Sequence, residues 1–434
     1  MKKIKRILSI TMAVMLVASI VPISASAESA SKADGEWISA WSTSPISASL
    51  NDLGVLDKLG VTLAAVSSRV TVTPTASGSQ ARLTFSNEFG VTPLTISACT
   101  IAHTGKDSKT VEYKTIENVK FDGKTYKVIP AGQVITSDPI DYAVTAGEKL
   151  TVTTYFRGIN TQRTIGLIGG DTYAAIGNFT HLSSMALGIP LALSADSGDY
   201  QVIPALKGIE VLTDDADACN CVIFGDSTVA NEIPRLLEAK LQANGITNVS
   251  VTQQAIKGNR LVADSVGVAA NVLGEAGVDR FERDVIQQAG VKYVVVKLGI
   301  NDIVHPYCKS KADKLTPVTF DEMVAGYTKL VEMAHANGIE IYFAELTPWK
   351  GYTRNILNKG DDVQWTEEID AIRVQLNAWF ASDACPADGY IFFPNMADPA
   401  DNCALAPGFS PDGIHFTAAG QQAFVDAFPI DIFR

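Results

Sequence analysis

A serine in the middle of the chain follows an apolar run, where it could act as a nucleophile. Residues 221–227 (CVIFGDS) have the pattern of a strand that ends in Gly-Asp-Ser, and residues 231–237 (NEIPRLL) that of a helix. Ser227 would then lie at the carboxyl end of a strand, where open α/β sheets bind ligands. A helix amino end there would favour the negative charge that develops in acyl transfer. Gly-Asp-Ser alone is equally typical of a turn, so the prediction depends on further residues.

A histidine near the carboxyl end could supply the base that a serine nucleophile requires. A hydroxyl reacts only when a base takes its proton and a third group orients that base. Among five histidines, His415 is the one that stands in a suitable motif, residues 410–415 (SPDGIH), just before a helical run. Asp412, three residues earlier, can fix the imidazole tautomer. The alternative is a polar turn that caps the last helix through Thr417.

Two further segments could supply an oxyanion hole. Residues 294–299 (VVVKLG) read as a buried parallel strand, and Asn301 follows with a side-chain amide. Residues 249–252 read as another strand, and Gly258 follows with a backbone N–H that no side chain would block. With the N–H of Ser227, these donors could hold a developing oxyanion. Each segment alone is more typical of a turn, but their order after successive strands favours a site.

Ser227, Gly258, Asn301 and His415 resemble the four blocks of the SGNH hydrolases, also called GDSL esterases. Further segments are similar to a secreted, two-domain branch of that family, in which a β-rich domain precedes the hydrolase. They are residues 346–348 (LTP), Arg373 with residues 377–379 (NAW), residues 398–401 (DPAD), and the opening segments 37–45 (WISAWSTSP) and 83–90 (LTFSNEFG). One departure is Thr228–Val229, where the family usually has Ile-Thr or similar. The chain contains no Gly-x-Ser-x-Gly, which the α/β-hydrolase elbow requires.

The pattern of elements predicts two domains. Residues 37–212 alternate short β-type runs with turns, which is typical of a β-sandwich. Residues 213–434 alternate strands and helices, which predicts a flavodoxin-like parallel sheet with helices on both faces. The expected β runs are 68–73, 81–85, 94–101, 149–156 and 208–212, with a later strand at 339–346. The expected helices are 232–244, 281–289, 320–337, 367–380 and 417–428.

The amino end reads as a secretory signal. Residues 1–27 join four positive charges, an apolar stretch and a small-residue cleavage site, and residues 28–36 form a linker. A membrane anchor is the alternative, but the apolar stretch is short. We therefore expect a secreted protein. Removing the four positive charges changes the net charge from −12 to −16, which disfavours nucleic acid and anionic membranes as partners.

The cysteines and histidines indicate no metal site and no cofactor. Cys219 and Cys221 have no second Cys/His cluster to complete a ligand set. In an exported protein disulfides can persist, and Cys385 with Cys403 is the expected pair.

The resemblance implies a serine esterase acting on short acyl esters, and export suggests O-acetyl groups on polysaccharide. A lipase or lysophospholipase is the alternative within this class, and a non-catalytic carbohydrate-binding protein is the alternative outside it. His305 is a second candidate for the base or for a substrate contact. Trp349, Tyr352 and Trp365 could stack on sugar rings, although packing of their loop is the simpler explanation.

We predict that ester hydrolysis needs no metal, because no ligand set stands at metal-binding spacing. Activity should survive dialysis against EDTA. A loss of activity that zinc restores would show that the sequence conceals a metal site.

Overall fold

The computed structural model describes residues 35–48, 61–193, 200–230, 232–266, 270–309, 315–353 and 363–434. The expected signal peptide and most of the linker lie outside these residues. Residues 35–434 form one compact unit. Among the described residues, no helix combines the length and the apolar character needed to cross a membrane.

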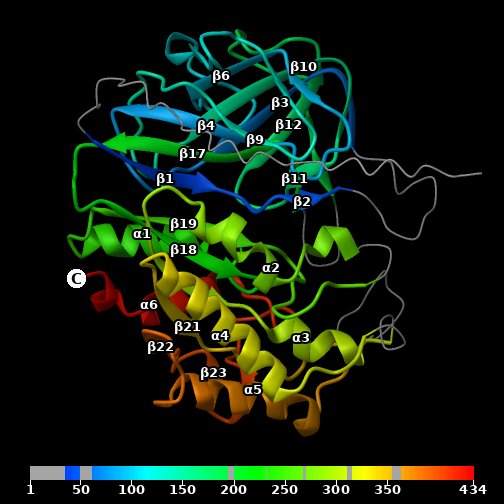
Figure 1. Ribbon diagram of the computed structural model, residues 1–434, viewed down its shortest axis with the longest axis vertical. Coiled ribbons are helices and arrows are strands. Elements are labelled where there is room, and N and C mark those ends of the chain that lie inside the picture. The colour runs from blue at the N-terminus through cyan, green and yellow to red at the C-terminus, as the bar shows by residue number, and fades with distance from the viewer. Residues whose placement is uncertain are drawn as a thin grey trace, which may run out of the picture. The chain divides into compact units, whose positions relative to one another are not determined.

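The amino-terminal part of this unit is built from strands (Figure 1). Two antiparallel sheets dominate it, with strand orders β1-β17-β4-β9 and β13-β12-β3-β10-β6-β7, and a smaller sheet has the order β16-β11-β2. The strands are β1 Glu36–Ser42, β2 Ile46–Ser47, β3 Val61–Val72, β4 Gln80–Ser86, β5 Leu94–Ile96, β6 Ala98–His103, β7 Glu117–Asn118, β8 Lys127–Ile129, β9 Val134–Thr136, β10 Leu150–Gln162, β11 Thr164–Gly166, β12 Asp171–Ile176, β13 Ile189–Pro190, β14 Ala192–Leu193, β15 Tyr200–Gln201, β16 Ile203–Pro204 and β17 Leu206–Thr213.

Alternating side chains make these sheets a sandwich. In β4, Ala81, Leu83 and Phe85 are buried and alternate with less buried residues, as expected for a strand with one face on a core. They share one apolar cluster with Val152 of β10 and Ile209 of β17, so both large sheets contribute to it. The predicted β-sandwich is therefore confirmed.

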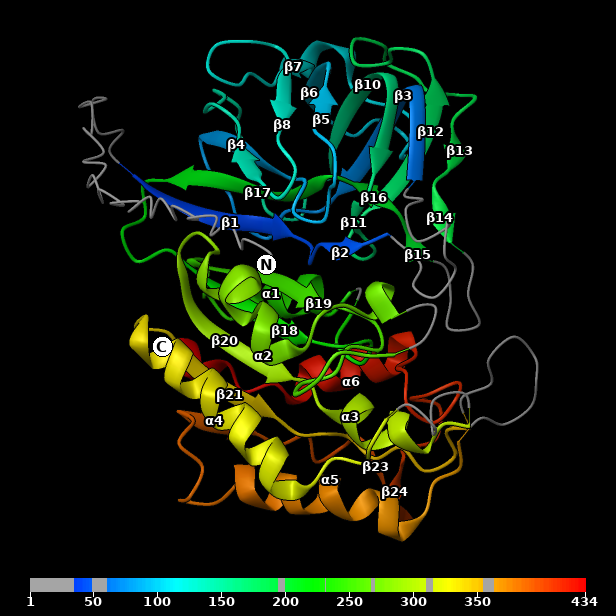
Figure 2. The same ribbon diagram turned by 45° about the vertical axis from the view of Figure 1, so that its right-hand side comes forward.

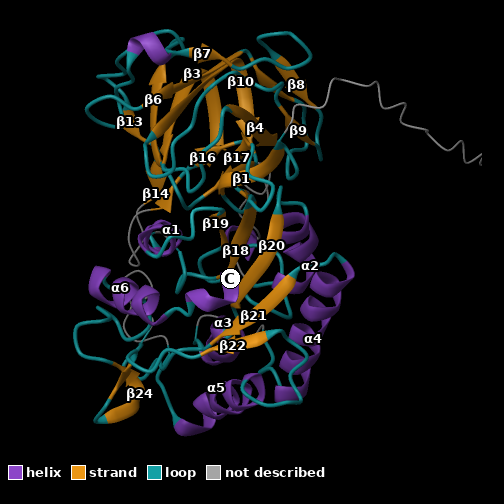
Figure 3. Ribbon diagram, turned by 90° about the vertical axis from the view of Figure 1, so that its left-hand side faces the viewer, coloured by secondary structure: helices purple, strands orange, loops and turns teal. Residues whose placement is uncertain are grey.

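The carboxyl-terminal part is a parallel sheet with the order β19-β18-β20-β21-β22, which is the flavodoxin-like order 2-1-3-4-5. Helices α1 and α6 cover one face, and α2, α4 and α5 the other (Figure 3). The strands are β18 Cys219–Gly225, β19 Val249–Ala255, β20 Val291–Lys297, β21 Glu340–Ala344 and β22 Gly389–Ile391, with a hairpin of β23 Ala397–Asp398 and β24 Asp401–Leu405. The helices are α1 Ile233–Ala243, α2 Gly277–Phe281, α3 Ile300–Val304, α4 Phe320–Ala336, α5 Glu367–Phe380 and α6 Ala418–Ala427, and short 3₁₀ turns occupy Tyr113–Thr115, Ala270–Leu273, His305–Tyr307 and Ile430–Phe433.

Local signals place most of these elements where the sequence predicts them. Thr319 and Glu322 form a capping box that starts α4, and Thr366 and Thr417 cap α5 and α6 through their hydroxyls. The predicted run 94–101 is instead two strands that belong to different sheets. Strand β5 pairs with β8, whereas β6 is part of the six-stranded sheet.

The predicted helix at 281–289 starts earlier, as α2, and continues as a π-helical turn, Glu282–Ile286. Helix α3 and strand β22 were not predicted, since each is too short to show a period.

The sandwich and the parallel sheet meet along β1 and β19 (Figure 2). The Ser250 hydroxyl donates to the Ser39 carbonyl at 2.5 Å, and the Thr75 hydroxyl donates to the Val251 carbonyl at 2.8 Å. One apolar cluster also joins Ile46 of β2 to Ile233 of α1. The predicted change of pattern between residues 212 and 213 falls at the end of β17, just before the connection to β18.

The six cysteines, all within the described residues, form no disulfide. The expected Cys385–Cys403 pair is wrong for this structure. Cys385 lies in the turn after α5, and Cys403 lies in β24. Both segments are loop-rich, but sequence spacing does not determine whether two Cβ atoms come close enough for a bond.

We predict that Gly225→Ala destabilises the protein by about 1–3 kcal/mol, because a Cβ there would overlap the Lys297 carbonyl and the Val229 side chain. Gly208→Ala is the matched control, since a Cβ there lies 3.4 Å from the Trp41 carbonyl oxygen, an ordinary contact. The control should change the free energy of unfolding by less than about 0.5 kcal/mol. Urea unfolding followed by circular dichroism measures both, and equal effects would contradict the packing described for β18.

Candidate active site

Ser227 lies in a turn directly after β18, at the edge of the sheet where parallel strands end. Its neighbours Asp226 and Thr228 are buried, whereas Ser227 itself is partly exposed. The expected helix amino end does not begin at this residue. Helix α1 starts only at Ile233, and Asn231 lies outside the described residues. Five residues separate Ser227 from Ile233, so the serine is not part of the first turn of α1, where a helix dipole acts most strongly.

Ser227, His415 and Asp412 form a continuous chain of hydrogen bonds. Ser227 Oγ lies 3.0 Å from His415 Nε2, and His415 Nδ1 lies 2.6 Å from Asp412 Oδ2. An ionised carboxylate can only accept, so Nδ1 carries the proton and Nε2 is left as an acceptor for the serine hydroxyl. This arrangement can deprotonate a serine. The sequence-predicted partners therefore come together, although 188 positions separate the histidine from the serine.

The turn that carries the histidine is organised within itself. Asp412 Oδ1 accepts hydrogen bonds from the backbone N–H of Ile414 at 3.1 Å and of His415 at 2.9 Å. Burial alone would raise the pKa of Asp412, but the hydrogen bonds and charge of His415 outweigh burial and lower it to about 2. Asp412 is thus ionised across the range in which proteins work. Gly413 adopts a φ of +94°, and a Cβ there would lie 2.6 Å from the Tyr352 backbone nitrogen.

The aromatic residues of the loop after β21 differ in their surroundings. Tyr352 packs edge-on against the His415 ring, with centroids 6.1 Å apart at 86°. Trp349 is fully buried, and its Nε1 donates to Asp370 at 2.7 Å. Trp365 is half-buried beneath the Lys350 ammonium. Packing therefore explains Trp349, and Tyr352 is a neighbour of the histidine that spacing alone did not reveal.

The three candidate oxyanion donors follow β18, β19 and β20, which end at the same edge of the sheet. The backbone N–H groups of Ser227 and Gly258 make no hydrogen bond to any of the described residues. Asn301 is the second residue of α3, and its side-chain amide donates a hydrogen bond to the Asn259 carbonyl at 2.9 Å. Gly258 has a φ of +75°, and a Cβ there would lie 2.7 Å from Leu273. The positive φ favours glycine at this turn.

A buried carboxylate joins the turn after β19 to the helix after β20. Asp302 is fully buried and accepts from the backbone N–H of Leu261 at 2.6 Å and of Val262 at 3.1 Å. Arg260 lies 3.7 Å away as its ion-pair partner. Burial raises the pKa of Asp302 to about 6, against the charge of Arg260. Because Asp302 follows Asn301 directly, it fixes that amide relative to the turn that carries Gly258.

Two further buried charged side chains, Asp226 and Lys297, are linked through Thr228, the residue after Ser227. Asp226 Oδ1 accepts from the Thr228 N–H at 2.9 Å and from its hydroxyl at 2.8 Å. Lys297, at the end of β20, donates to the Thr228 hydroxyl at 3.1 Å and to the Thr347 hydroxyl at 3.2 Å. Burial raises the pKa of Asp226 and lowers that of Lys297 to about 8. Thr228, where the sequence departs from the family pattern, thus bridges the two charges.

Two side chains of α5 hold the backbone that follows β21 in place. Asn377 binds both backbone polar groups of Leu346, accepting at 3.0 Å and donating at 2.9 Å. Arg373 donates to the same carbonyl at 3.3 Å and forms an ion pair with Asp370 at 2.6 Å. These residues, which the sequence associates with the family, position Thr347.

His305 and His335 differ from His415 in their surroundings. His305 is buried at the start of a 3₁₀ turn and its exposed fraction is 3%, whereas His335 is exposed and contacts Asp388 at 2.9 Å. His415 is the histidine that contacts Ser227. Within the described ranges, no group of three or more His, Cys, Asp or Glu residues is arranged to hold a metal ion.

Residues 223–423, in the carboxyl-terminal part, match the GDSL-like Lipase/Acylhydrolase family, whose members are generally esterases or lipases. The match supports a GDSL/SGNH acylhydrolase domain in this part of the chain. The match begins within β18, at Ile223, and includes the segment with Asp412 and His415. No match was found among curated proteins.

Solved structures of three enzymes are among those similar to this chain. A GDSL-like lipase from Bacteroides thetaiotaomicron is 18% identical over 48% of this chain and 84% of its own, with a TM-score of 0.32. An aryl esterase from M. smegmatis is 14% identical over 48% and 96%, with a TM-score of 0.33. A family two carbohydrate esterase from Cellvibrio japonicus is 11% identical over 91% and 96%, with a TM-score of 0.31.

We predict that Asp412→Asn lowers kcat by about a thousand- to ten-thousandfold while KM changes little, because an amide can hold the imidazole in the wrong tautomer. Asp426→Asn, an exposed carboxylate of α6, is the control and should keep full activity. Steady-state kinetics on one soluble ester measures both variants. A loss confined to KM would contradict the orienting role.

Proposed function

We propose that this protein is a serine esterase that hydrolyses short acyl esters outside the cell. The observation that carries the proposal is the pair of contacts at His415, 3.0 Å to the Ser227 hydroxyl and 2.6 Å to the Asp412 carboxylate. Together they form the arrangement that activates a serine. The GDSL-like family match across this segment supports the same reaction class.

In the proposed mechanism, Ser227 Oγ attacks the ester carbonyl carbon while His415 Nε2 takes the hydroxyl proton. The tetrahedral intermediate collapses, the bond to the leaving alcohol breaks, and the alcohol takes the proton from Nε2. A water molecule then attacks the acyl-enzyme, gives its proton to Nε2 and releases the acid, and that proton returns to Ser227. Asp412 stabilises the imidazolium in both halves of the reaction.

The proposed oxyanion hole consists of the N–H groups of Ser227 and Gly258 and the amide of Asn301. Two observations support it. The two backbone N–H groups make no hydrogen bond to the described residues, and the bond from Asn301 to the Asn259 carbonyl orients its amide while leaving a second N–H available. Each such donor contributes about a hundred- to a thousandfold in rate.

The proposed substrate class is a small acyl ester, with O-acetyl groups on extracellular polysaccharide as the natural form. The secretory pattern of residues 1–27 supports an extracellular substrate. The resemblance to the secreted two-domain SGNH branch supports short acyl groups. The proposed reaction requires no cofactor.

Two other functions make different predictions. A lipase or lysophospholipase would prefer long acyl chains presented in micelles. A non-catalytic carbohydrate-binding protein would have no activated serine. The contacts at His415 favour an enzyme over a binding protein, since a binding site needs no such base.

We predict that a fluorophosphonate labels Ser227 in the native protein, because the probe reacts only with an activated serine. Ser227→Ala should lose the label and lower kcat by about a millionfold or to background, with an unchanged circular dichroism spectrum. Labelling at another serine, or near-native turnover by a folded Ser227→Ala variant, would refute the mechanism.

The same preparation decides the substrate class. Turnover of p-nitrophenyl esters should fall as the acyl chain lengthens from acetyl, and acetate should be released from acetylated xylan or pectin. A preference for long chains in micelles would instead favour the lipase.

A further inference from the structure

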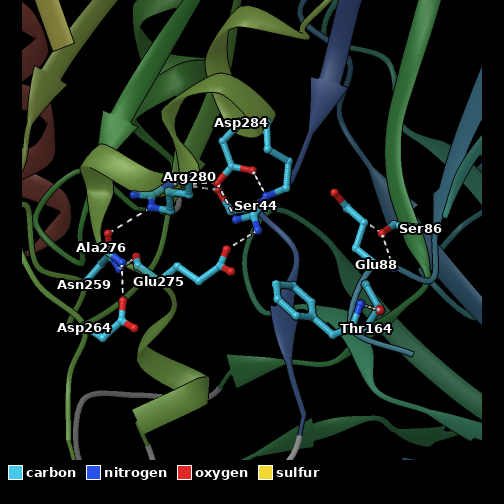
Figure 4. A network of polar contacts seen from close by, with 12 residues as sticks. Ser44, Ser86, Glu88, Thr164, Asn259, Asp264, Glu275, Ala276, Arg280 and Asp284 are labelled. Atoms are coloured by element: carbon cyan, nitrogen blue, oxygen red, sulfur yellow. Dashed lines mark hydrogen bonds and ion pairs between the residues drawn. The ribbon is translucent and has the colours of Figure 1, made fainter. Parts of the chain in front are cut away.

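The side chain of Arg280 lies in a buried polar network with Ser44, Asn259 and Asp284 (Figure 4). It belongs to α2, directly before the π-helical turn, and it is completely buried. Burial lowers its pKa to about 10, against the opposing charge of Asp284. A buried guanidinium is costly unless its donors are paired, and here its partners are backbone groups next to the residues proposed to react.

The guanidinium binds the ends of two of the three strands that lead to the site. Nη2 donates to the Gly225 carbonyl at 3.0 Å, and Nη1 donates to the Gln254 carbonyl at 2.9 Å. Gly225 is the last residue of β18, before Asp226 and Ser227, and Gln254 is near the end of β19. The planar fork therefore fixes the separation of the two strand ends.

The guanidinium also binds the turn after β19 that carries Gly258. Nε donates to the Asn259 side-chain oxygen at 2.9 Å, and the Asn259 amide donates to the carbonyls of Leu273 and Glu275, both at 2.8 Å. Asn259 directly follows Gly258, and its own carbonyl accepts the bond from Asn301. One side chain thus connects the backbone before the nucleophile to the turn that carries Gly258 and accepts the hydrogen bond from Asn301.

The sandwich contributes to the same cluster. Ser44, between β1 and β2, accepts from Arg280 Nη1 at 3.3 Å and donates to the Gln254 side chain at 2.7 Å. The Gln254 amide donates to Ser42 at 2.8 Å. Asp284 balances the charge, accepting from Arg280 at 2.9 Å and from Arg283 at 2.8 Å.

We propose that Arg280 is a positioning residue for ester hydrolysis, which holds the Ser227 strand end and the Gly258–Asn259 turn at the spacing of the oxyanion hole, with Ser44 of the sandwich as part of the same support. The inference rests on the proposed function. It means that the sandwich is a structural part of the active site as well as a neighbouring domain. A displacement of about 1 Å between reacting groups can cost about a hundredfold in rate, which sets the scale of the effect.

Arg280→Lys tests the proposal, because an ammonium keeps the charge beside Asp284 but cannot reach the three acceptors in one plane. We expect kcat per fluorophosphonate-labelled site to fall by about ten- to a hundredfold, with KM within about threefold of the native value. Counting labelled sites removes any unfolded fraction from the comparison. Arg283→Lys is the matched control, since Arg283 binds Asp284 and Glu275 but neither strand end, and it should keep native kcat.

Ser44→Ala is the second variant, because it removes one hydroxyl from the guanidinium and from Gln254 and leaves both strands intact. It should lower kcat per labelled site by about three- to tenfold without changing KM. Unchanged kcat per labelled site in folded Arg280→Lys would overturn the inference, even if the melting temperature fell. If Arg280→Lys does not fold, unchanged kcat in Ser44→Ala overturns it alone. A native protein that the probe fails to label would overturn the proposed function itself, and with it this inference.

Discussion

The candidate site depends on one constraint, which is that three adjacent parallel strands end together at one buried edge. Gly225 of β18 pairs with Ala255 of β19 on one side and with Lys297 of β20 on the other. All seven residues of β18 and of β19 are buried, so a slip of one residue would exchange the side chains packed on the two faces of the sheet. The register is therefore fixed by packing. Because Ser227, Gly258 and Asn301 each follow one of these strands, their backbones reach the same place.

The two halves of the serine–histidine pair are organised by different means. Ser227 is positioned by β18, and hydrogen bonds from Arg280 to Gly225 and from Lys297 to Thr228 hold the residues around it. His415 lies in a turn that holds itself through Asp412, with Gly413 allowing the backbone to pass close to Tyr352. The side-chain contact between the halves is one hydrogen bond of 3.0 Å. The turn with Asp412 and His415, just before α6, thus completes a site whose other residues are positioned by the sheet.

Buried charge surrounds this edge of the sheet. Asp226, Lys297, Arg280 and Asp302 are all essentially inaccessible to solvent, and Asp226 Oδ2 has no hydrogen-bond partner in the described part of the chain. Burying such groups costs several kcal/mol per ion unless each is paired, and well-packed apolar residues would often be as stable. What the charges supply is directional bonding to backbone groups at the strand ends, which apolar side chains cannot provide. Their arrangement favours precise geometry at the site over maximal stability.

Sequence alone determined the fold class, most elements and the residues that meet at the candidate site. Strand and helix periods, capping residues and the order of four short motifs are local signals, and local signals survive in a single chain. The sequence did not reveal the supporting groups, Arg280, Asp302 and Lys297, or that Cys385 and Cys403 remain unpaired. Nor did it show that Ser227 precedes the first turn of α1. These features depend on which distant backbone groups come within about 3 Å of a side chain, and only the packing of the sheet, its helices and the sandwich sets those distances.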